Sequence, residues 1–188
     1  MPKRKKKITK KTSKKSKKII KAQLIGESII SSNKEAKNLY SNKRFGEIIN
    51  KKVYYTFPEA LYLLEKKKIE VYVKRKKLSF SELMKKAKNI DKKIETKFFV
   101  FRNIRNRGYM VKSALKFGAE FRVYDRGILP GKKHARWILY PVKESDELTW
   151  YDFSAKNRVA HSTKKKLLIG IVDDEGDVSF YEVGWIKP

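Results

Sequence analysis

Apolar runs and periodic amphipathic segments alternate along the first half of the chain. One helix is predicted over residues 57–68, because Pro58 suits a first helical position and apolar side chains recur at helical spacing after it. In another predicted helix, Ser79 and Glu82 have the spacing of an N-terminal capping box. The elements predicted in this half are strands at 22–31 and 69–73 and helices at 33–41, 57–68 and 78–88.

The second half of the chain is richer in strand patterns. A helix over residues 96–108 is expected to end at Gly108, and a second helix lies within 149–165. Residues 127–131 form a turn-rich loop. The predicted strands are 109–113, 120–125, 135–142, 167–173 and 178–186, the last two forming a hairpin around the sequence DEGD.

Together these patterns predict an α+β protein with an N-terminal tail and two domains. A small α/β domain is expected at residues 22–93, and a domain of mixed sheet flanked by helices at 94–188. The tail, residues 1–21, holds 12 basic residues and no acidic one, and it is predicted to be disordered because it has almost nothing to bury. Whether it is only a solvated charge run or an arm that contacts RNA stays open.

Charge is the strongest compositional signal. The chain has 48 Lys and Arg against 20 Asp and Glu, a net charge of +28, which attracts polyanions. Outside the tail, 36 basic residues still face 20 acidic ones, a net charge of +16. A body that is itself so basic favours a nucleic-acid-binding fold over a globular domain with a basic tether.

Residue types that are missing exclude several classes of protein. The 188 residues include no cysteine, which excludes disulfides, thiol catalysis and cysteine-bound zinc. No apolar run approaches the ~20 residues of a membrane-spanning helix, and the basic start lacks the apolar core of a secretory signal. We therefore expect a soluble cytoplasmic protein without membrane association.

Two residues near the turn-rich loop are candidates for chemistry. Tyr124 lies near the end of a predicted strand, where packing is the commoner role of a tyrosine, although neighbouring cations favour the phenolate that a base requires. His134 lies on a loop just before a strand, where reactive groups concentrate, although its spacing among lysines alone favours an ordinary surface residue. The other histidine, His161, lies inside a predicted helix and is interpreted as structural.

Charged clusters near the C-terminus offer further candidates. Lys164, Lys165 and Lys166 join a helix to a buried strand, where a lysine could face a phosphate, although the position alone favours a basic helix end stabilised by the helix dipole. The acidic cluster Asp173, Asp174, Glu175 and Asp177 lacks the spacing of a calcium-binding EF-hand loop. It is better explained as a hairpin turn that could plug a basic groove.

Taken together, these residue types permit a ribonuclease that uses no metal. RNA carries its own nucleophile, the 2′-hydroxyl. Cleavage then needs a base, an acid for the leaving 5′-oxygen and a cation for the charged phosphorane. Tyrosine, histidine and lysine can fill these roles, and we expect neither a metal nor another cofactor.

Long segments of the chain closely resemble the archaeal tRNA-splicing endonuclease, also called tRNA-intron endonuclease. The segments are FRNIRNRGYMVKSALKFGAEFRVYDRG (101–127), RVAHSTKKKLLIGIVDDEGDVSFYEVGWIKP (158–188), and, in the N-terminal part, LIGESIIS (24–31) and EALYLLEKKKIEV (59–71). The resemblance covers residues 22–188. It implies cleavage of precursor tRNA at both ends of an intron, within a bulge-helix-bulge fold, without a metal, leaving 2′,3′-cyclic phosphate and 5′-hydroxyl ends.

The resemblance also implies roles for individual residues. The family's catalytic tyrosine, histidine and lysine fall on Tyr124 as general base, His134 as general acid and Lys165 as electrostatic stabiliser, with the adjacent lysines as alternatives to the last. Arg158 and Trp185 are candidates for stacking on bulged RNA bases.

The resemblance implies a homotetramer, in which the acidic loop Asp173–Asp177 docks into a basic groove of another subunit. One alternative is a noncatalytic RNA-binding or structural subunit of such a complex. A second is a generic basic RNA-binding protein.

Overall fold

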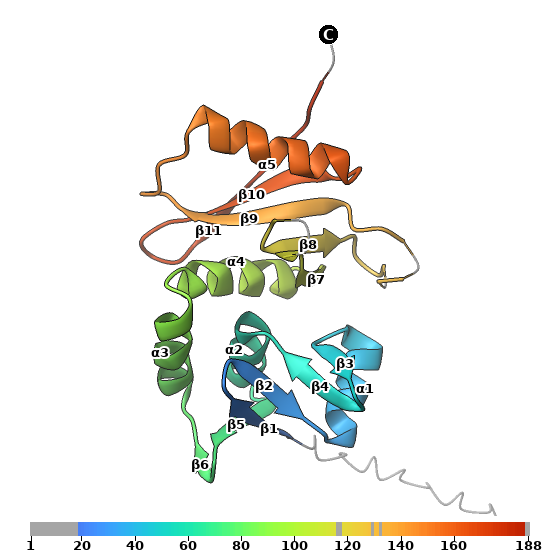
Figure 1. The fold of residues 1–188 in the computed structure, drawn as a ribbon, viewed down its shortest axis with the longest axis vertical. Coiled ribbons are helices and arrows are strands. Elements are labelled where there is room, and N and C mark those ends of the chain that lie inside the picture. The colour runs from blue at the N-terminus through green and yellow to red at the C-terminus, as the bar shows by residue number, and fades with distance from the viewer. Residues whose placement is uncertain (1–18, 116–117, 129, 132, 187–188) are drawn as a thin grey trace, which may run out of the picture.

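The structure, a computed structural model, describes residues 19–115, 118–128, 130–131 and 133–186. In this part of the chain two β-sheets lie one above the other, each with its own helices (Figure 1). No helix among these residues is long and apolar enough to span a membrane. In chain order the elements are β1 Ile20–Ile25, β2 Ser28–Ser31, α1 Lys34–Lys43, β3 Glu47–Ile49, β4 Lys52–Tyr55, α2 Phe57–Glu65, β5 Ile69–Val73, β6 Lys76–Lys77, α3 Phe80–Ile90, α4 Ile94–Asn106, β7 Met110–Ser113, β8 Phe121–Tyr124, β9 Trp137–Lys143, α5 Trp150–Ser162, β10 Lys166–Val172 and β11 Val178–Val183.

The N-terminal sheet has the strand order β3-β4-β2-β1-β5-β6. Its strands pair antiparallel except β1 and β5, which run parallel and are joined by a long connection that ends with α2. Helix α2 begins with a capping box of Thr56 and Glu59 and buries Leu61 and Leu63 completely. The predicted capping box of Ser79 and Glu82 is confirmed at the start of α3.

The C-terminal sheet has the order β11-β10-β9-β8-β7 and is mixed, since only β9 and β10 run parallel. Strand alternation sends Val123 and Leu139 to the face covered by α4, and Ile138 and Tyr140 to the face on which α5 packs. Figure 1 shows the two helices on opposite sides of the sheet. The predicted α+β fold, with a mixed sheet flanked by helices, is confirmed.

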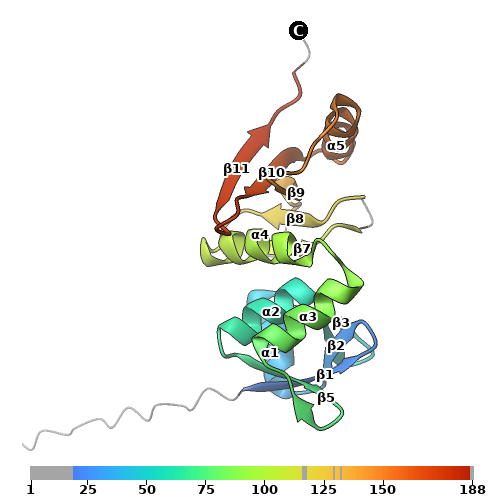
Figure 2. The same cartoon turned by 90° about the vertical axis from the view of Figure 1, so that its left-hand side faces the viewer.

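Helix α4 lies at the boundary between the two halves in both views (Figures 1 and 2). Tyr62 of α2 meets Phe101 of α4 edge-on, with ring centroids 5.9 Å apart, and Phe101 also contacts Phe121 of β8, with ring centroids 5.8 Å apart. One apolar cluster therefore runs through both halves, from Ile20 to Val178. The predicted domain boundary at residues 93 and 94 coincides with the start of α4, but the core is continuous across it.

The predicted tail boundary is wrong by two residues. Ile20 and Lys21, which we assigned to the tail, belong to β1, and Ile20 is buried opposite Ile69 of β5. An isoleucine that can add an apolar contact to a parallel strand pair is better placed in the sheet than in solvent. Residues 1–18, and with them the predicted disorder of the tail, lie outside the described residues.

The short strands β3, β4 and β6 were not predicted. Strands β3 and β4 form a hairpin whose turn residues Asn50 and Lys51 have φ of 48° and 62°. This left-handed pair suits a type I′ turn, but the sequence lacks the Asn-Gly or Asp-Gly pair that normally signals one. Strands of two to four residues are also too short for alternation to be recognised.

Candidate active site

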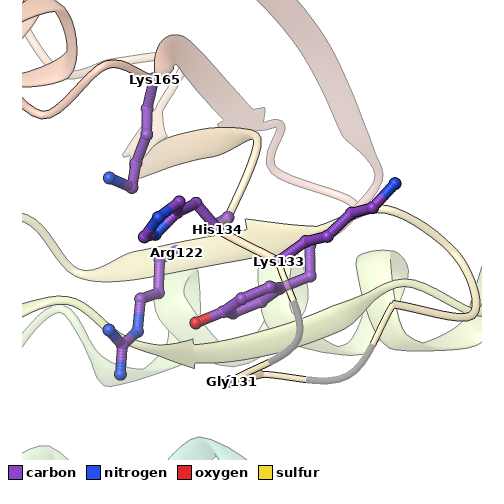
Figure 3. A pocket seen from close by; sticks show the side chains of 7 residues that line it. Arg122, Gly131, Lys133, His134 and Lys165 are labelled. Atoms are coloured by element: carbon purple, nitrogen blue, oxygen red, sulfur yellow. The ribbon is translucent and has the colours of Figure 1, made fainter.

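A pocket of about 300 Å³ opens beside β8, on the side of the C-terminal sheet away from α4 (Figure 3). It brings together the three residues that were predicted to be catalytic, although they come from segments far apart in the sequence. The lining residues are Arg122, Tyr124, Gly131, Lys133, His134, Ala135 and Lys165.

Tyr124 is the last residue of β8, paired with Met110 of β7. Its neighbour Val123 packs into the core under α4, so the alternation of the strand turns Tyr124 and Arg122 to the opposite face. The Tyr124 side chain is only 5% exposed, which fixes the ring by packing while the residue still lines the pocket.

His134 lies on the loop that joins β8 to β9. At the base of the loop, Arg136 donates its backbone N–H to the Val123 carbonyl at 2.9 Å, and its guanidinium pairs with Asp125 at 3.4 Å. Gly131 has a φ of +95°, a conformation that favours glycine, and it permits the turn just before the histidine. The result is an exposed imidazole on a loop whose two ends are tied together.

Lys165 enters the pocket from the junction between α5 and β10. Lys164 has a φ of +55°, which turns the chain after the helix, and Lys165 donates its backbone N–H to Ala160 at 2.9 Å. The Lys165 ammonium donates to the Thr163 carbonyl at 2.6 Å, which orients the side chain. Burial lowers the pKa of Lys165 below its usual value, and the positive charge of Arg122 lowers it further.

The two neighbouring lysines have other surroundings. Lys164 and Lys166 do not line this pocket, and Lys166 pairs with Glu182 of β11. Of the three lysines that the sequence offered, Lys165 is thus the one that lines the pocket with Tyr124 and His134.

The electrostatic character of the pocket is strongly positive. Arg122, Lys133 and Lys165 contribute cations, and none of the described residues that line it is an aspartate or glutamate. A pocket of this kind attracts phosphate groups. Its phenol, imidazole and ammonium groups are the types of side chain that an RNA transesterification needs as base, acid and cation.

Arg158 and Trp185, the predicted base-stacking residues, lie outside this pocket. Arg158 is exposed on α5. Trp185 is 56% exposed and packs against His161, with ring centroids 4.1 Å apart. These two rings line a separate hollow, which shares Lys165 with the pocket but does not include Tyr124 or His134. His161, which we interpreted as structural, is exposed and contacts the Trp185 ring at the surface.

The acidic loop Asp173–Asp177 forms the turn between β10 and β11. Asp173 accepts the backbone N–H of Asp177 at 2.8 Å, and Gly176 lies against the Phe99 ring. Lys165 and Asp173 flank the seven residues of β10, so their Cα atoms lie about 26 Å apart and the loop is remote from the pocket. Among the described residues, no three acidic or histidine side chains gather as a group that could hold a metal ion.

Sequence patterns did not single out Arg122. The only signal was its place two residues before Tyr124 in a predicted strand, which puts both side chains on one face. The pattern could not tell which face would be left uncovered by a helix.

Comparisons with known proteins match both halves of the chain. Residues 20–84 match the model of the tRNA intron endonuclease N-terminal domain, and residues 94–180 match that of the tRNA intron endonuclease catalytic C-terminal domain. The chain is 41% identical over 172 residues to the tRNA-splicing endonuclease of Pyrococcus horikoshii, which covers 91% of this chain and 99% of the relative.

Two other archaeal relatives carry the same name. The tRNA-splicing endonuclease of Thermococcus kodakarensis is 39% identical over 165 residues, which is 87% of this chain and 96% of the relative. That of Nanoarchaeum equitans is 47% identical over 136 residues, which is 69% of this chain and 87% of the relative. With both domains matched in order and the identities extending over most of each chain, this protein belongs to the tRNA intron endonuclease family.

Proposed function

We propose that this protein is an endonuclease that excises introns from precursor tRNA. The reaction is a metal-independent cleavage at bulge-helix-bulge splice sites, and it leaves 2′,3′-cyclic phosphate and 5′-hydroxyl ends. The observation that carries the proposal is the convergence of Tyr124, His134 and Lys165 on one cation-lined pocket, in a chain whose relatives are named tRNA-splicing endonucleases.

Each of the three residues has one role in the proposed reaction. Tyr124 accepts the proton of the 2′-hydroxyl as that oxygen attacks the neighbouring phosphorus. The new bond from phosphorus to the 2′-oxygen forms while the bond to the 5′-oxygen breaks, and His134 donates a proton to the departing 5′-oxygen. Lys165 stabilises the negative charge that builds up on the phosphorane oxygens.

The surroundings of Lys165 suit that role. Its ammonium donates to the Thr163 carbonyl at 2.6 Å, which orients the side chain toward the pocket that it lines. A cation that is held in place before the reaction does not have to reorient when charge develops on the phosphate.

Arg158 and Trp185 are proposed to hold the bulged bases. A guanidinium plane and an indole both stack on unpaired bases, and both side chains are exposed on the same half of the molecule as the pocket. The packing of His161 against one side of Trp185 fixes the indole, while more than half of its surface is accessible to a base.

We further propose that the active enzyme is a homotetramer. The acidic loop Asp173–Asp177 lies at the end of β10 remote from its own pocket, so it can dock on a basic surface of another copy. Two active subunits related by symmetry would then each cut one of the two splice sites.

The proposal is tested by incubating the purified protein with a bulge-helix-bulge RNA in excess EDTA and analysing the product ends. Cuts in both bulges with cyclic phosphate ends are expected. Cleavage that stops in EDTA would overturn the metal-independent mechanism. Tight binding without any cleavage would instead favour the alternative, a noncatalytic subunit of a splicing complex.

A further inference from the structure

Arg122 lies at the boundary between two pockets. Besides the catalytic pocket, it lines a second one of about 500 Å³ between the two halves of the chain, together with Tyr55, Glu59 and Lys112. In the view of Figure 3 its guanidinium points away from the His134 ring. An RNA strand that leaves the catalytic pocket toward the second pocket therefore has to pass Arg122.

The guanidinium of Arg122 lacks the partners that a structural arginine has. Its Nε is buried without a hydrogen-bond partner, and no carboxylate of the described residues pairs with it. A structural cation in such a position is normally hydrogen-bonded and paired, because burying an unpaired charge is costly.

Lys112, the residue opposite Arg122 on β7, shows what a structural cation looks like here. Its ammonium donates to the Gly46 carbonyl and lies 3.9 Å from the Glu59 carboxylate, and the side chain is 8% exposed. Lys112 thus joins the two halves of the chain. Among the described residues, no hydrogen bond or ion pair links the Arg122 side chain to another residue.

The neighbours of Arg122 increase the need for an anion. Its positive charge acts on Lys112 and on Lys165, and it lowers the pKa of both lysines in addition to the larger effect of burial. A phosphate bound to Arg122 would relieve this mutual repulsion.

We propose that Arg122 binds a phosphate of the RNA backbone that neighbours the cleaved one. The fork of N–H donors in a guanidinium matches phosphate oxygens. The second pocket is also lined by Glu27, Glu47 and Glu59, which repel anions, so the phosphate is expected where Arg122 borders the catalytic pocket. The inference rests on the proposed function and adds a residue that positions the substrate.

The first test measures single-turnover cleavage by Arg122→Met, Arg122→Lys and, as a matched control, Arg126→Met. Arg126 is an exposed arginine of the same segment that stacks on Tyr109 at 4.8 Å and does not line the pocket. Loss of a charge-assisted hydrogen bond predicts a fall in kcat/KM of about 10- to 100-fold for Arg122→Met. The Lys variant should recover part of this, and the control should stay near wild type.

A thermal melt of the same variants separates a functional role from a structural one. Arg122→Met removes an unpaired, partly buried cation from a cluster of cations, so its melting temperature should equal or exceed that of the wild type. A clear drop in melting temperature would mean that Arg122 holds the fold, and it would overturn the proposal.

The second test identifies the phosphate. A bulge-helix-bulge RNA with a 2′-deoxy nucleotide at each cut cannot be cleaved, and one uncharged methylphosphonate is placed at each linkage around the cut in turn. Wild type should lose affinity at a linkage adjacent to the cut, and Arg122→Met should show no further loss there. Equal losses in both proteins at every linkage would overturn the proposal.

The two proposals fail in different ways. If wild type cleaves but Arg122→Met matches it in rate and in the methylphosphonate scan, the Arg122 inference is wrong and the proposed function stands. If wild type does not cleave, the proposed catalytic function is wrong, and the binding scan still decides whether Arg122 contacts a phosphate.

Discussion

Lys112 and Lys165 both belong to the C-terminal half of the molecule, and in both burial lowers the pKa and Arg122 lowers it further. Their partners differ. The Lys112 ammonium is enclosed by the Gly46 carbonyl and the Glu59 carboxylate, whereas that of Lys165 donates to the Thr163 carbonyl and lines a pocket with Tyr124 and His134. A shifted pKa alone therefore does not distinguish a cation that holds the fold from one that serves chemistry.

The useful distinction is the sign of the surrounding charge. Where Glu59 balances Lys112, an added phosphate would meet repulsion as well as attraction. Among the described residues that line the pocket with Lys165, the other charged ones are cations, and this charge attracts a phosphate. The comparison predicts that changes on the Lys112 side will affect stability and that changes in the pocket will affect rate.

The largest effect on rate is expected for His134→Ala. Removing the acid that protonates the leaving 5′-oxygen should lower single-turnover cleavage by about 10²- to 10⁴-fold, with RNA affinity nearly unchanged. His161→Ala is the matched control, and at saturating RNA its rate should equal that of wild type. A rate for His134→Ala within a few fold of wild type would remove His134 from the mechanism.

The two lysines should respond in opposite ways when each is replaced by methionine. Lys165→Met should lose about 10²- to 10³-fold in cleavage rate with little change in melting temperature. Lys112→Met leaves Glu59 buried without its cation, so about 3–5 kcal/mol of unfolding free energy should be lost. Urea unfolding and single-turnover cleavage of both variants check this. A Lys112→Met variant that cleaves slowly but is as stable as wild type would contradict the prediction that the Lys112 side affects stability.

Sequence patterns could predict the main helices and strands because their signals are local. Pro58 and the Ser79–Glu82 capping box mark helix starts that the structure confirms. The β3–β4 hairpin was missed because Asn50 and Lys51 form a turn with an unusual residue pair. The start of β1 at Ile20 depends on pairing with Ile69, a contact that no local pattern reveals.

The candidate site shows the same limit. Tyr124, His134 and Lys165 were predicted from the resemblance of long segments, while spacing alone favoured packing, surface and helix-end roles for them. Arg122 could not be singled out, since its significance depends on which face of the sheet α5 leaves open and on where the second pocket lies.

A smaller effect, and one specific to Lys165, is expected at alkaline pH. Because the Lys165 pKa lies below the usual 10.5, the active ammonium is lost and the rate should fall as pH rises toward that value. In the pH range between the folded and the unfolded pKa of Lys165, the unfolded chain binds the proton more tightly. Titration of this group therefore makes the fold more stable as pH rises, so it cannot lower the rate by unfolding the protein. Lys165→Arg should move the alkaline fall to higher pH, because arginine stays protonated.

The control for this pH profile is Lys112→Arg, which should keep the alkaline fall where the wild type has it. Rates are measured in single turnovers, with the uncatalysed hydrolysis of the RNA subtracted at each pH. If Lys165→Arg and wild type fall at the same pH, another group causes the loss of activity.

The smallest effect on rate is expected from residues 1–18, whose 11 basic residues represent a third use of positive charge. These residues are expected to contribute a general attraction to phosphates. Replacing them with a neutral Gly-Ser segment of equal length should weaken RNA binding and flatten its dependence on salt, while the cleavage rate at saturating RNA stays the same. An unaltered affinity and salt slope would assign the electrostatic attraction to the body of the protein, with its net charge of +16 outside residues 1–21.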